Sequence, residues 1–338
     1  MTDHAIKDRS IADKHSSTAV LLVNLGTPDE PTTPAIRRYL KEFLSDRRVI
    51  EAPKLIWWFV LNLVILRFRP AKLITHYKKI WENGESPIRR ITDLQVSKLQ
   101  ARLKQSTDLN NVKVAGAMTY GNPSLKDVLK QLQSEGYENI LVLPLFPQYS
   151  ATTTAAAWDA LTKATSEMRN IPQIRFIKRY NKHPLYIEAL ASSVREHWKT
   201  TSRQAKLFFS FHGLPKAYVE KGDPYANECV ETVELVTKAL NLSDEEWALC
   251  YQSRVGVAEW LQPYTDETMK ELGNTKLKGL DVICPGFSAD CLETIEEIDE
   301  ENRGYFEQAG GNDFHYIPAL NDQDGHIDLI EALVKEHL

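Results

Sequence analysis

Residues 208–215 read FFSFHGLP, an apolar run that ends on His212 directly before Gly213 and Pro215. A short apolar run that meets Gly and Pro is typical of a buried β-strand followed by a turn. We therefore expect His212 at the carboxyl end of a strand. Open α/β sheets bind their ligands at that end, so this histidine is a candidate functional residue.

The rest of the chain alternates strand-like and helix-like patterns. Strand-like apolar runs occur at 19–24, 112–117, 140–145, 175–177, 207–211, 249–252 and 281–284. Between them lie patterns with helical spacing at 91–104, 124–135, 155–168, 184–199, 225–239 and 266–272. Alternation of this kind predicts parallel sheets joined by right-handed crossovers.

The alternating strands and helices form two successive sets, which are separated near 170–172. This arrangement predicts an α/β fold of two doubly wound, Rossmann-like domains, 18–168 and 169–318, whose parallel sheets face a common cleft. We expect residues 319–338 to form a C-terminal helix that packs back on the first domain. The loops after the strands contain neither GxGxxG nor a P-loop motif, so the usual phosphate-binding loops are missing.

Composition limits the class of protein. The 338 residues carry a net charge of −5, which gives no electrostatic footprint for nucleic acid. The cysteines form no CxxC pair, which argues against a zinc knuckle and fits a reducing cytosol; they are Cys229, Cys250, Cys284 and Cys291. Residues 1–17 are polar and lack the apolar segment of a signal peptide, so we expect a cytoplasmic protein.

Residues 55–66 read LIWWFVLNLVIL, and basic residues lie on both sides of this run. A helix needs about 20 apolar residues to span a bilayer, so the segment is too short to do so. Two interpretations remain open. The segment is either a buried core helix or an exposed apolar lip for a hydrophobic ligand or a membrane surface, with Arg67 and Arg69 at the level of the lipid headgroups.

Acidic residues follow the last of these strand-like runs. The segment ADCLETIEEIDEEN, 289–302, has helical spacing, and Ser288 or Asp290 can cap its start. Asp290, Glu293 and Glu297 would lie on one face of that helix. Such a face is either simply solvated or, beside an imidazole at the end of a strand, a site for a borderline cation such as ferrous iron. Carboxylates there can also take up protons.

Eight segments together resemble one known family, the ferrochelatases. They are VNLGTP at 23–28, SPIRR at 86–90, LFPQYSATTT at 145–154, SFHGLP at 210–215, GDPY at 222–225, QSRVG at 252–256, WLQPYTDET at 260–268 and DCLETIEEI at 290–298. Each segment alone is a weak signal, but eight in the family's order are specific. The resemblance extends from Leu21 to about Leu333, and the chain is similar to the short proteobacterial form of the family.

This resemblance implies a lyase that inserts ferrous iron into protoporphyrin IX, forming protohaem and releasing two protons, as the last step of haem biosynthesis. Iron is then a substrate, and no resident cofactor is implied. A planar porphyrin points its nitrogen lone pairs into the ring, so the protein must distort the macrocycle with binding energy from elsewhere. The alternatives are a chelatase for coproporphyrin or cobalt, and a haem- or porphyrin-binding protein without turnover.

The resemblance also implies the site residues. His212 matches the family's catalytic histidine, and Glu293 matches a second essential residue across the porphyrin ring. Ferrous iron would meet His212, Glu293, Glu297 and Asp290. The porphyrin would lie in an apolar slot lined by Leu25, Ile56, Trp57, Tyr149 and Trp260. Its propionates would pair with polar residues in the family motifs, namely Lys78, Lys79, Ser86, Arg89, Ser253 and Arg254.

Three features depart from parts of the family. Cys291 stands where animal members have a histidine, and Asn24 stands where some Gram-positive members have a tyrosine. The second difference argues against the coproporphyrin-using branch. No cysteine follows Cys291, so we expect no C-terminal iron–sulfur cluster. An apolar lip and a hydrophobic substrate predict weak contact with the periphery of the inner membrane, and the sequence leaves the oligomeric partner open.

Overall fold

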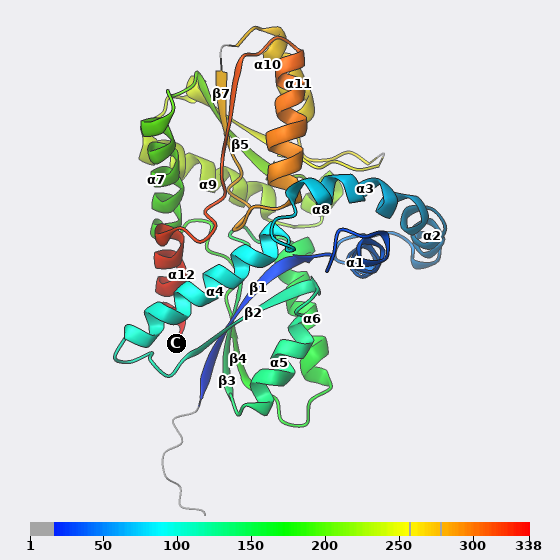
Figure 1. Ribbon diagram of the computed structural model, residues 1–338, viewed down its shortest axis with the longest axis vertical. Helices are drawn as coiled ribbons and strands as arrows, with labels where there is room; N and C mark the ends of the chain where they lie inside the picture. The colour runs from blue at the N-terminus through cyan, green and yellow to red at the C-terminus, as the bar shows by residue number, and fades with distance from the viewer. Residues whose placement is uncertain (1–16, 257, 278) are drawn as a thin grey trace, which may run out of the picture.

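The computed structural model describes residues 17–256, 258–277 and 279–338, and most of the polar N-terminal segment, residues 1–16, lies outside this part of the chain. The described strands form two parallel four-stranded sheets, in the lower and upper halves of Figure 1. The first sheet has the order β2-β1-β3-β4, with β1 (Thr18–Thr27), β2 (Lys113–Gly121), β3 (Asn139–Pro144) and β4 (Gln173–Phe176). The second has the order β6-β5-β7-β8, with β5 (Lys206–His212), β6 (Trp247–Gln252), β7 (Gly279–Ile283) and β8 (Asp313–Ile317). The predicted α/β fold with two doubly wound halves is confirmed.

Helices connect these strands. In the first half they are α1 (Thr33–Ser45), α2 (Lys54–Phe59), the π-helical η1 (Val60–Ile65), α3 (Leu66–Ile80), α4 (Pro87–Gln105), α5 (Leu125–Ser134), the π-helical η2 (Ala151–Ala155) and α6 (Ala156–Ser166). In the second half they are α7 (Pro184–Thr200), α8 (Lys216–Glu220), α9 (Tyr225–Leu240), the 3-10 helix η3 (Asp244–Glu246), α10 (Thr265–Asn274), the π-helical η4 (Leu292–Asn302), α11 (Arg303–Gln308) and α12 (Asp324–His337). The C-terminal helix α12 contacts both α4 and α7, so it joins the two halves.

Both faces of the central strand β1 are buried, which explains its unbroken apolar sequence. Ala19, Leu21 and Val23 pack on one face against α5 and α6. Val20 and Leu22 pack on the other face, in a cluster that also contains side chains of α4, α7, β5 and α12. One hydrophobic core therefore continues across the expected domain boundary at 168/169.

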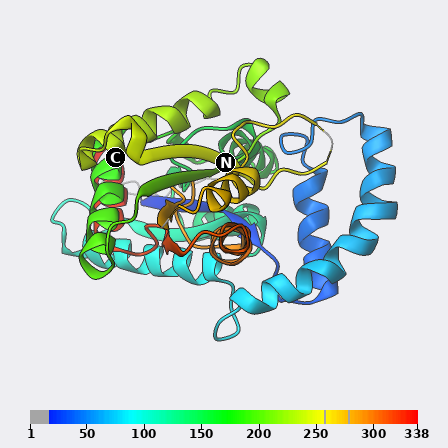
Figure 2. The ribbon, with the colours of Figure 1, turned by 90° about the horizontal axis from the view of Figure 1, so that it is seen from above.

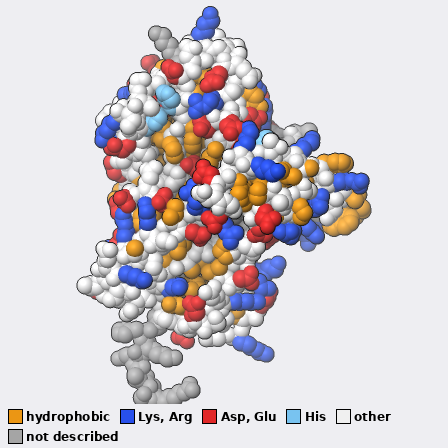
Figure 3. Space-filling view, viewed as in Figure 1, with side chains coloured by type: hydrophobic (Ala, Val, Ile, Leu, Met, Phe, Trp, Pro, Cys, Tyr) orange, Lys and Arg blue, Asp and Glu red, His pale blue; other side chains and the backbone are white. Residues whose placement is uncertain are grey.

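The apolar segment 55–66 does not form a buried core helix. It is divided between α2, η1 and the first residue of α3. Figures 1 and 2 show α2 and η1 projecting from the edge of the molecule, away from both sheets. The segment's large side chains are mostly exposed, and Figure 3 shows apolar side chains at this tip. We call this surface the lip; its exposed apolar residues are Leu55, Ile56, Trp58, Phe59, Val60, Leu63, Val64 and Phe68. Among the described residues, no helix is long and apolar enough to cross a membrane.

Candidate active site

A cavity opens between the carboxyl ends of the two sheets. Its walls come from the carboxyl end of β1, the start of α4, the loops after β3 and β7, and the start of η4. The lining includes apolar side chains, among them Leu25, Ile88, Phe146 and Phe287, together with His212. The cavity lies in the crevice where doubly wound folds bind ligands.

His212 is the last residue of β5 and lines this cavity. The chain turns at Gly213, where a Cβ would lie 2.9 Å from the carbonyl oxygen of Gln252 and 3.2 Å from the Trp260 ring, so the close packing favours glycine. The Nδ1 atom of His212 lies 2.8 Å from the carbonyl oxygen of Gly213. Because a carbonyl oxygen only accepts, Nδ1 carries the ring proton. Nε2 therefore keeps a lone pair for a proton or a metal ion.

Glu293 lines the cavity from the first turn of η4. The thiol of Cys291 and the phenols of Tyr39 and Tyr77 come from the same lining. Burial, and to a smaller extent the negative charge of Glu293, raises the pKa of each of these three groups well above its usual range. These three groups stay protonated at neutral pH.

Glu297 lies four residues further along η4, behind the cavity lining. Its carboxylate accepts hydrogen bonds from the Ser253 N–H at 2.6 Å, from the Ser253 hydroxyl and from the Gln252 amide at 3.3 Å. Burial raises the pKa of Glu297 to about 7; the Ser253 and Gln252 hydrogen bonds lower it, while the nearby Glu293 charge raises it. A carboxyl group that titrates near neutral pH can pass a proton between the cavity and solvent.

Comparison with known proteins decides the family. The family model described as ferrochelatase matches residues 17–338. The chain belongs to the ferrochelatase family. A ferrochelatase from Psychrobacter sp. strain PRwf-1 is 53% identical over 317 residues, which cover 94% of this chain and 93% of that protein. A ferrochelatase from Acinetobacter baumannii strain ACICU is 48% identical over 94% of each chain.

Solved structures share the fold of this ferrochelatase-family chain at much lower identity. SirB from Bacillus subtilis with Fe³⁺ has a TM-score of 0.52 and 12% identity, covering 95% of both chains. CbiX, the terminal enzyme of sirohaem biosynthesis in denitrifying bacteria, has a TM-score of 0.51 and 13% identity, covering 95% of this chain and 99% of its own. At these identities the likeness concerns the fold alone.

The helix that carries Glu293 and Glu297 differs from the expected one. It is π-helical and begins at Leu292, with Cys291 as its N-cap, so the expected cap at Ser288 or Asp290 is wrong. A π-helix is rare and often occurs at functional sites. Glu293 and Glu297 both lie within it, four residues apart, whereas Asp290 precedes it.

Asp290 is a buried carboxylate with protein partners on several sides. Its oxygens accept hydrogen bonds from side chains and from one backbone N–H, provided by Thr294, Tyr316, Asn321 and Ala319. These contacts tie the start of η4 to the segment after β8. Asp290 is outside the cavity lining and does not extend the Glu293–Glu297 pair, contrary to the expected ladder of three acids.

The structure brings only some of the predicted porphyrin contacts to the cavity. Leu25 and Ser86 line it. The half-buried Trp57 donates its indole N–H to the Leu44 carbonyl oxygen at 2.6 Å and packs in the same apolar cluster as Leu25. Ile56 is 63% exposed on the lip. The base of the lip is therefore anchored beside the cavity, whereas its outer surface is free.

The other predicted porphyrin contacts lie outside the cavity lining, and most already have protein partners. The Lys178 ammonium lies 4.6 Å from the centre of the Tyr149 ring, and the Trp260 indole N–H donates to the Val255 carbonyl oxygen. Three of the predicted propionate partners bind protein carboxylates: Lys79 pairs with Glu300, Arg254 with Asp266 and Glu267, and Ser253 with Glu297. Lys78 is exposed on α3, and Arg89 is half-buried on α4.

Sequence reasoning missed two tyrosines of the site, Tyr39 on α1 and Tyr77 on α3. Both helices pack against each other beside the cavity, and both tyrosines are buried. The available signal was the position of Tyr77 directly before the predicted Lys78. It was too local to show that a helix from another part of the chain forms the same wall.

Proposed function

We propose that this chain inserts ferrous iron into protoporphyrin IX as the final step of haem formation. Fe²⁺ replaces the two pyrrole N–H protons of the porphyrin, so one protohaem and two protons leave for each metal ion. The observation that carries the proposal is that the Nε2 lone pair of His212 and the carboxylate of Glu293 both belong to the lining of one mainly apolar cavity.

The two acceptors divide the work that insertion requires. Nε2 of His212 has one lone pair, so at any moment it either takes a pyrrole proton or holds iron. Glu293 supplies a second acceptor from another wall of the cavity. Glu297 lies behind Glu293, and burial raises its pKa to about 7. It therefore provides the next place for a proton on its way to solvent.

The apolar walls provide the binding energy for distortion of the macrocycle. Side chains from both halves of the molecule enclose the cavity, including Leu25 at the end of β1 and Phe287 in the loop after β7. A porphyrin held between loops of two sheets can be bent out of plane, which turns the pyrrole lone pairs toward an incoming metal. Iron enters as substrate, and the proposal includes no iron–sulfur cluster or other resident cofactor.

The choice of porphyrin and metal separates this function from a chelatase for coproporphyrin or cobalt. Asn24 lines the cavity, and its amide donates to the Thr92 hydroxyl at 3.1 Å. Anaerobic initial rates with protoporphyrin IX and coproporphyrin, each with Fe²⁺ and Co²⁺, test the choice. We expect protoporphyrin with Fe²⁺ to be the best pair; equal rates with coproporphyrin would contradict the substrate, and binding without turnover would indicate a carrier.

The lip supports a second, finer proposal, that the protein contacts the periphery of the inner membrane from the cytoplasmic side. Its exposed apolar side chains are flanked by Lys54, Arg67 and Arg69, which suits a surface of apolar chains and anionic headgroups. Vesicle co-sedimentation in low salt and with neutral or anionic lipids tests this. We expect weak, reversible binding that is stronger to anionic vesicles.

A further inference from the structure

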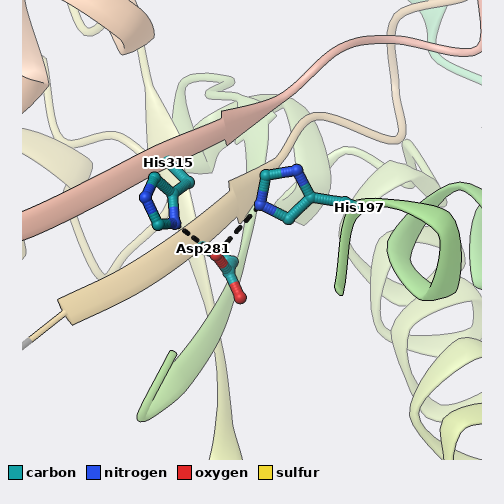
Figure 4. Close-up of side chains that lie close together, drawn as sticks. All are labelled: His197, Asp281 and His315. Carbon is teal, nitrogen blue, oxygen red and sulfur yellow. Dashed lines mark hydrogen bonds and ion pairs between the residues drawn. The ribbon is translucent and has the colours of Figure 1, made fainter. Parts of the chain in front are cut away.

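A second cluster of side chains that can bind a metal lies in the second half of the molecule, away from the cavity. His197 comes from α7, Asp281 from β7 and His315 from β8, and Figure 4 shows both imidazole rings beside the carboxylate. Within the described ranges, this is the one group of three or more His, Cys or acidic residues whose ligand atoms all lie within 4.8 Å of one another.

The two distances from Asp281 to the imidazole nitrogens fit a tetrahedral metal site. The Oδ1 atom of Asp281 lies 3.3 Å from Nε2 of His197 and 3.2 Å from Nδ1 of His315. Two ligands held about 2.0–2.1 Å from Zn²⁺ at the tetrahedral angle lie roughly 3.3 Å apart. A strong imidazolium–carboxylate hydrogen bond is shorter, at about 2.7–2.9 Å.

The carboxylate is fixed by its other oxygen. Oδ2 of Asp281 accepts a hydrogen bond from the Trp198 indole N–H at 2.7 Å and another from the Gln204 backbone N–H at 3.3 Å. These donors leave Oδ1 as the atom directed at the two imidazoles, as outer-shell partners do in metal sites. Nε2 of His197 is buried and makes no hydrogen bond, so a ligand nitrogen there is left unsatisfied.

Strand register places this cluster far from His212. Asp281 pairs with Leu207, which lies five residues before His212 in β5. At about 3.3 Å per residue, roughly 17 Å of strand separate the two positions. The cluster therefore belongs to the amino-terminal part of the second sheet, and iron insertion at the other end does not use it.

We propose that His197, Asp281 and His315 form a second metal site, for a borderline divalent cation such as Zn²⁺. Two imidazole nitrogens and one carboxylate oxygen are the ligands such cations prefer, and solvent can supply a fourth beside His315, whose side chain is 30% exposed. Binding requires the Nδ1–H tautomer of His197 and the Nε2–H tautomer of His315, so each ring keeps its proton. The cation would join α7, β7 and β8 and stabilise the second half of the fold.

Counting bound Zn²⁺ tests the site directly. Full-length protein freed of metal is titrated with Zn²⁺ alone, and His197→Gln and His315→Gln are compared with His337→Gln, which removes an exposed histidine elsewhere. We expect the first two variants to bind one Zn²⁺ fewer than the wild type and the control. Zn²⁺ at 100 times its Kd should raise the Tm of the wild type by about 4 °C through this site, and this rise should be missing in both variants.

Co²⁺ spectroscopy separates this site from the catalytic one. Visible bands of tetrahedral Co²⁺ should persist in His212→Ala and disappear in His315→Gln, whereas His315→Gln should retain iron insertion. Equal Zn²⁺ counts and equal Tm shifts in the wild type and the three variants of the Zn²⁺ titration would overturn the proposal. The cluster would then be a metal-free Asp–His network. If the wild-type protein did not insert iron, that result would instead contradict the proposed function.

Discussion

The two ends of the second sheet both bring imidazole and carboxylate groups together, but they arrange them differently. At the carboxyl end, His212 and Glu293 line an open cavity from separate walls, and no hydrogen bond joins them among the described residues. At the amino end, Oδ1 of Asp281 lies within 3.3 Å of two imidazole nitrogens. Separated acceptors suit a metal ion that arrives and leaves with a large ligand, whereas packed ligands suit a cation that stays.

The largest expected effect comes from removing the imidazole at the carboxyl end. His212→Ala should lower the initial rate of haem formation by about 10³-fold, because it deletes the acceptor or iron ligand at the cavity. Porphyrin binding, measured by fluorescence quenching, should remain, since the apolar walls are intact. His315→Gln at the amino end is the matched control. Similar losses in both variants would erase the distinction between the two ends.

Removing the second acceptor should have the next largest effect. Glu293→Gln preserves the shape of the side chain but cannot take a proton, and we expect about a 10²-fold lower rate. The control is Glu300→Gln, an exposed position on the same helix that pairs with Lys79. A variant Glu293→Gln that works as fast as Glu300→Gln would show that the acceptor lies elsewhere.

Glu297 should make the free energy of unfolding depend on pH. Because burial raises its pKa to about 7 in the folded protein, from an ordinary value of 4.5, the folded state binds a proton that the unfolded state has lost between these pH values. Its contribution to stability is thus fully present below pH 4.5 and falls as pH rises to 7, by at most about 3 kcal/mol.

Glu297→Gln mimics the protonated form and should remove this dependence. Urea unfolding at pH 5 and pH 8 should therefore show a smaller loss of stability with pH in the variant than in the wild type. The slope of iron insertion rate against pH near 7 should flatten as well. An unchanged pH profile in both measurements would rule out Glu297 as the group that titrates there.

Asp290 should behave as a structural carboxylate. Asp290→Asn places an amide against groups that donate to the present oxygens, and we expect a loss of about 2 kcal/mol in the free energy of unfolding. The rate of iron insertion per folded molecule should stay close to that of the wild type. A rate loss as large as that of Glu293→Gln, without loss of stability, would restore Asp290 to the metal path.

The smallest expected effect on the enzyme comes from the outer surface of the lip. Replacing both Trp58 and Phe59 with Ser should weaken binding to anionic vesicles by roughly tenfold or more, since both side chains are exposed. The free energy of unfolding should change by less than about 0.5 kcal/mol per position. Ile171→Ser removes an exposed apolar side chain outside the lip and should leave vesicle binding unchanged. Equal vesicle binding by all three proteins would contradict the membrane contact.

The sequence contained enough information for the elements that depend on local pattern. Apolar runs such as 19–24 and 207–211 predicted strands, and FFSFHGLP placed His212 at a strand end. Family motifs added Glu293. The acidic segment was predicted as helical, but helical spacing alone does not separate an α-helix from the π-helix η4, in which the backbone bonding pattern differs.

The rest of the site depends on contacts between distant segments. Lys79 and Arg254 read as free cations for propionates, yet their charges are met by Glu300 on η4 and by Asp266 and Glu267 on α10. The three members of the second cluster lie far apart in the sequence and meet only because α7 packs beside the β7–β8 edge. Single-sequence patterns contain no signal for such pairings.

The most direct test of the central claim is the balance of the reaction itself. Anaerobic wild-type protein is mixed with protoporphyrin IX and Fe²⁺ in weak buffer, and haem absorbance and proton release are followed together, with His212→Ala as the parallel sample. The account predicts two protons released for each haem formed by the wild type and almost no haem from the variant. Porphyrin binding without haem or protons in the wild type, or a full rate in His212→Ala, would contradict it.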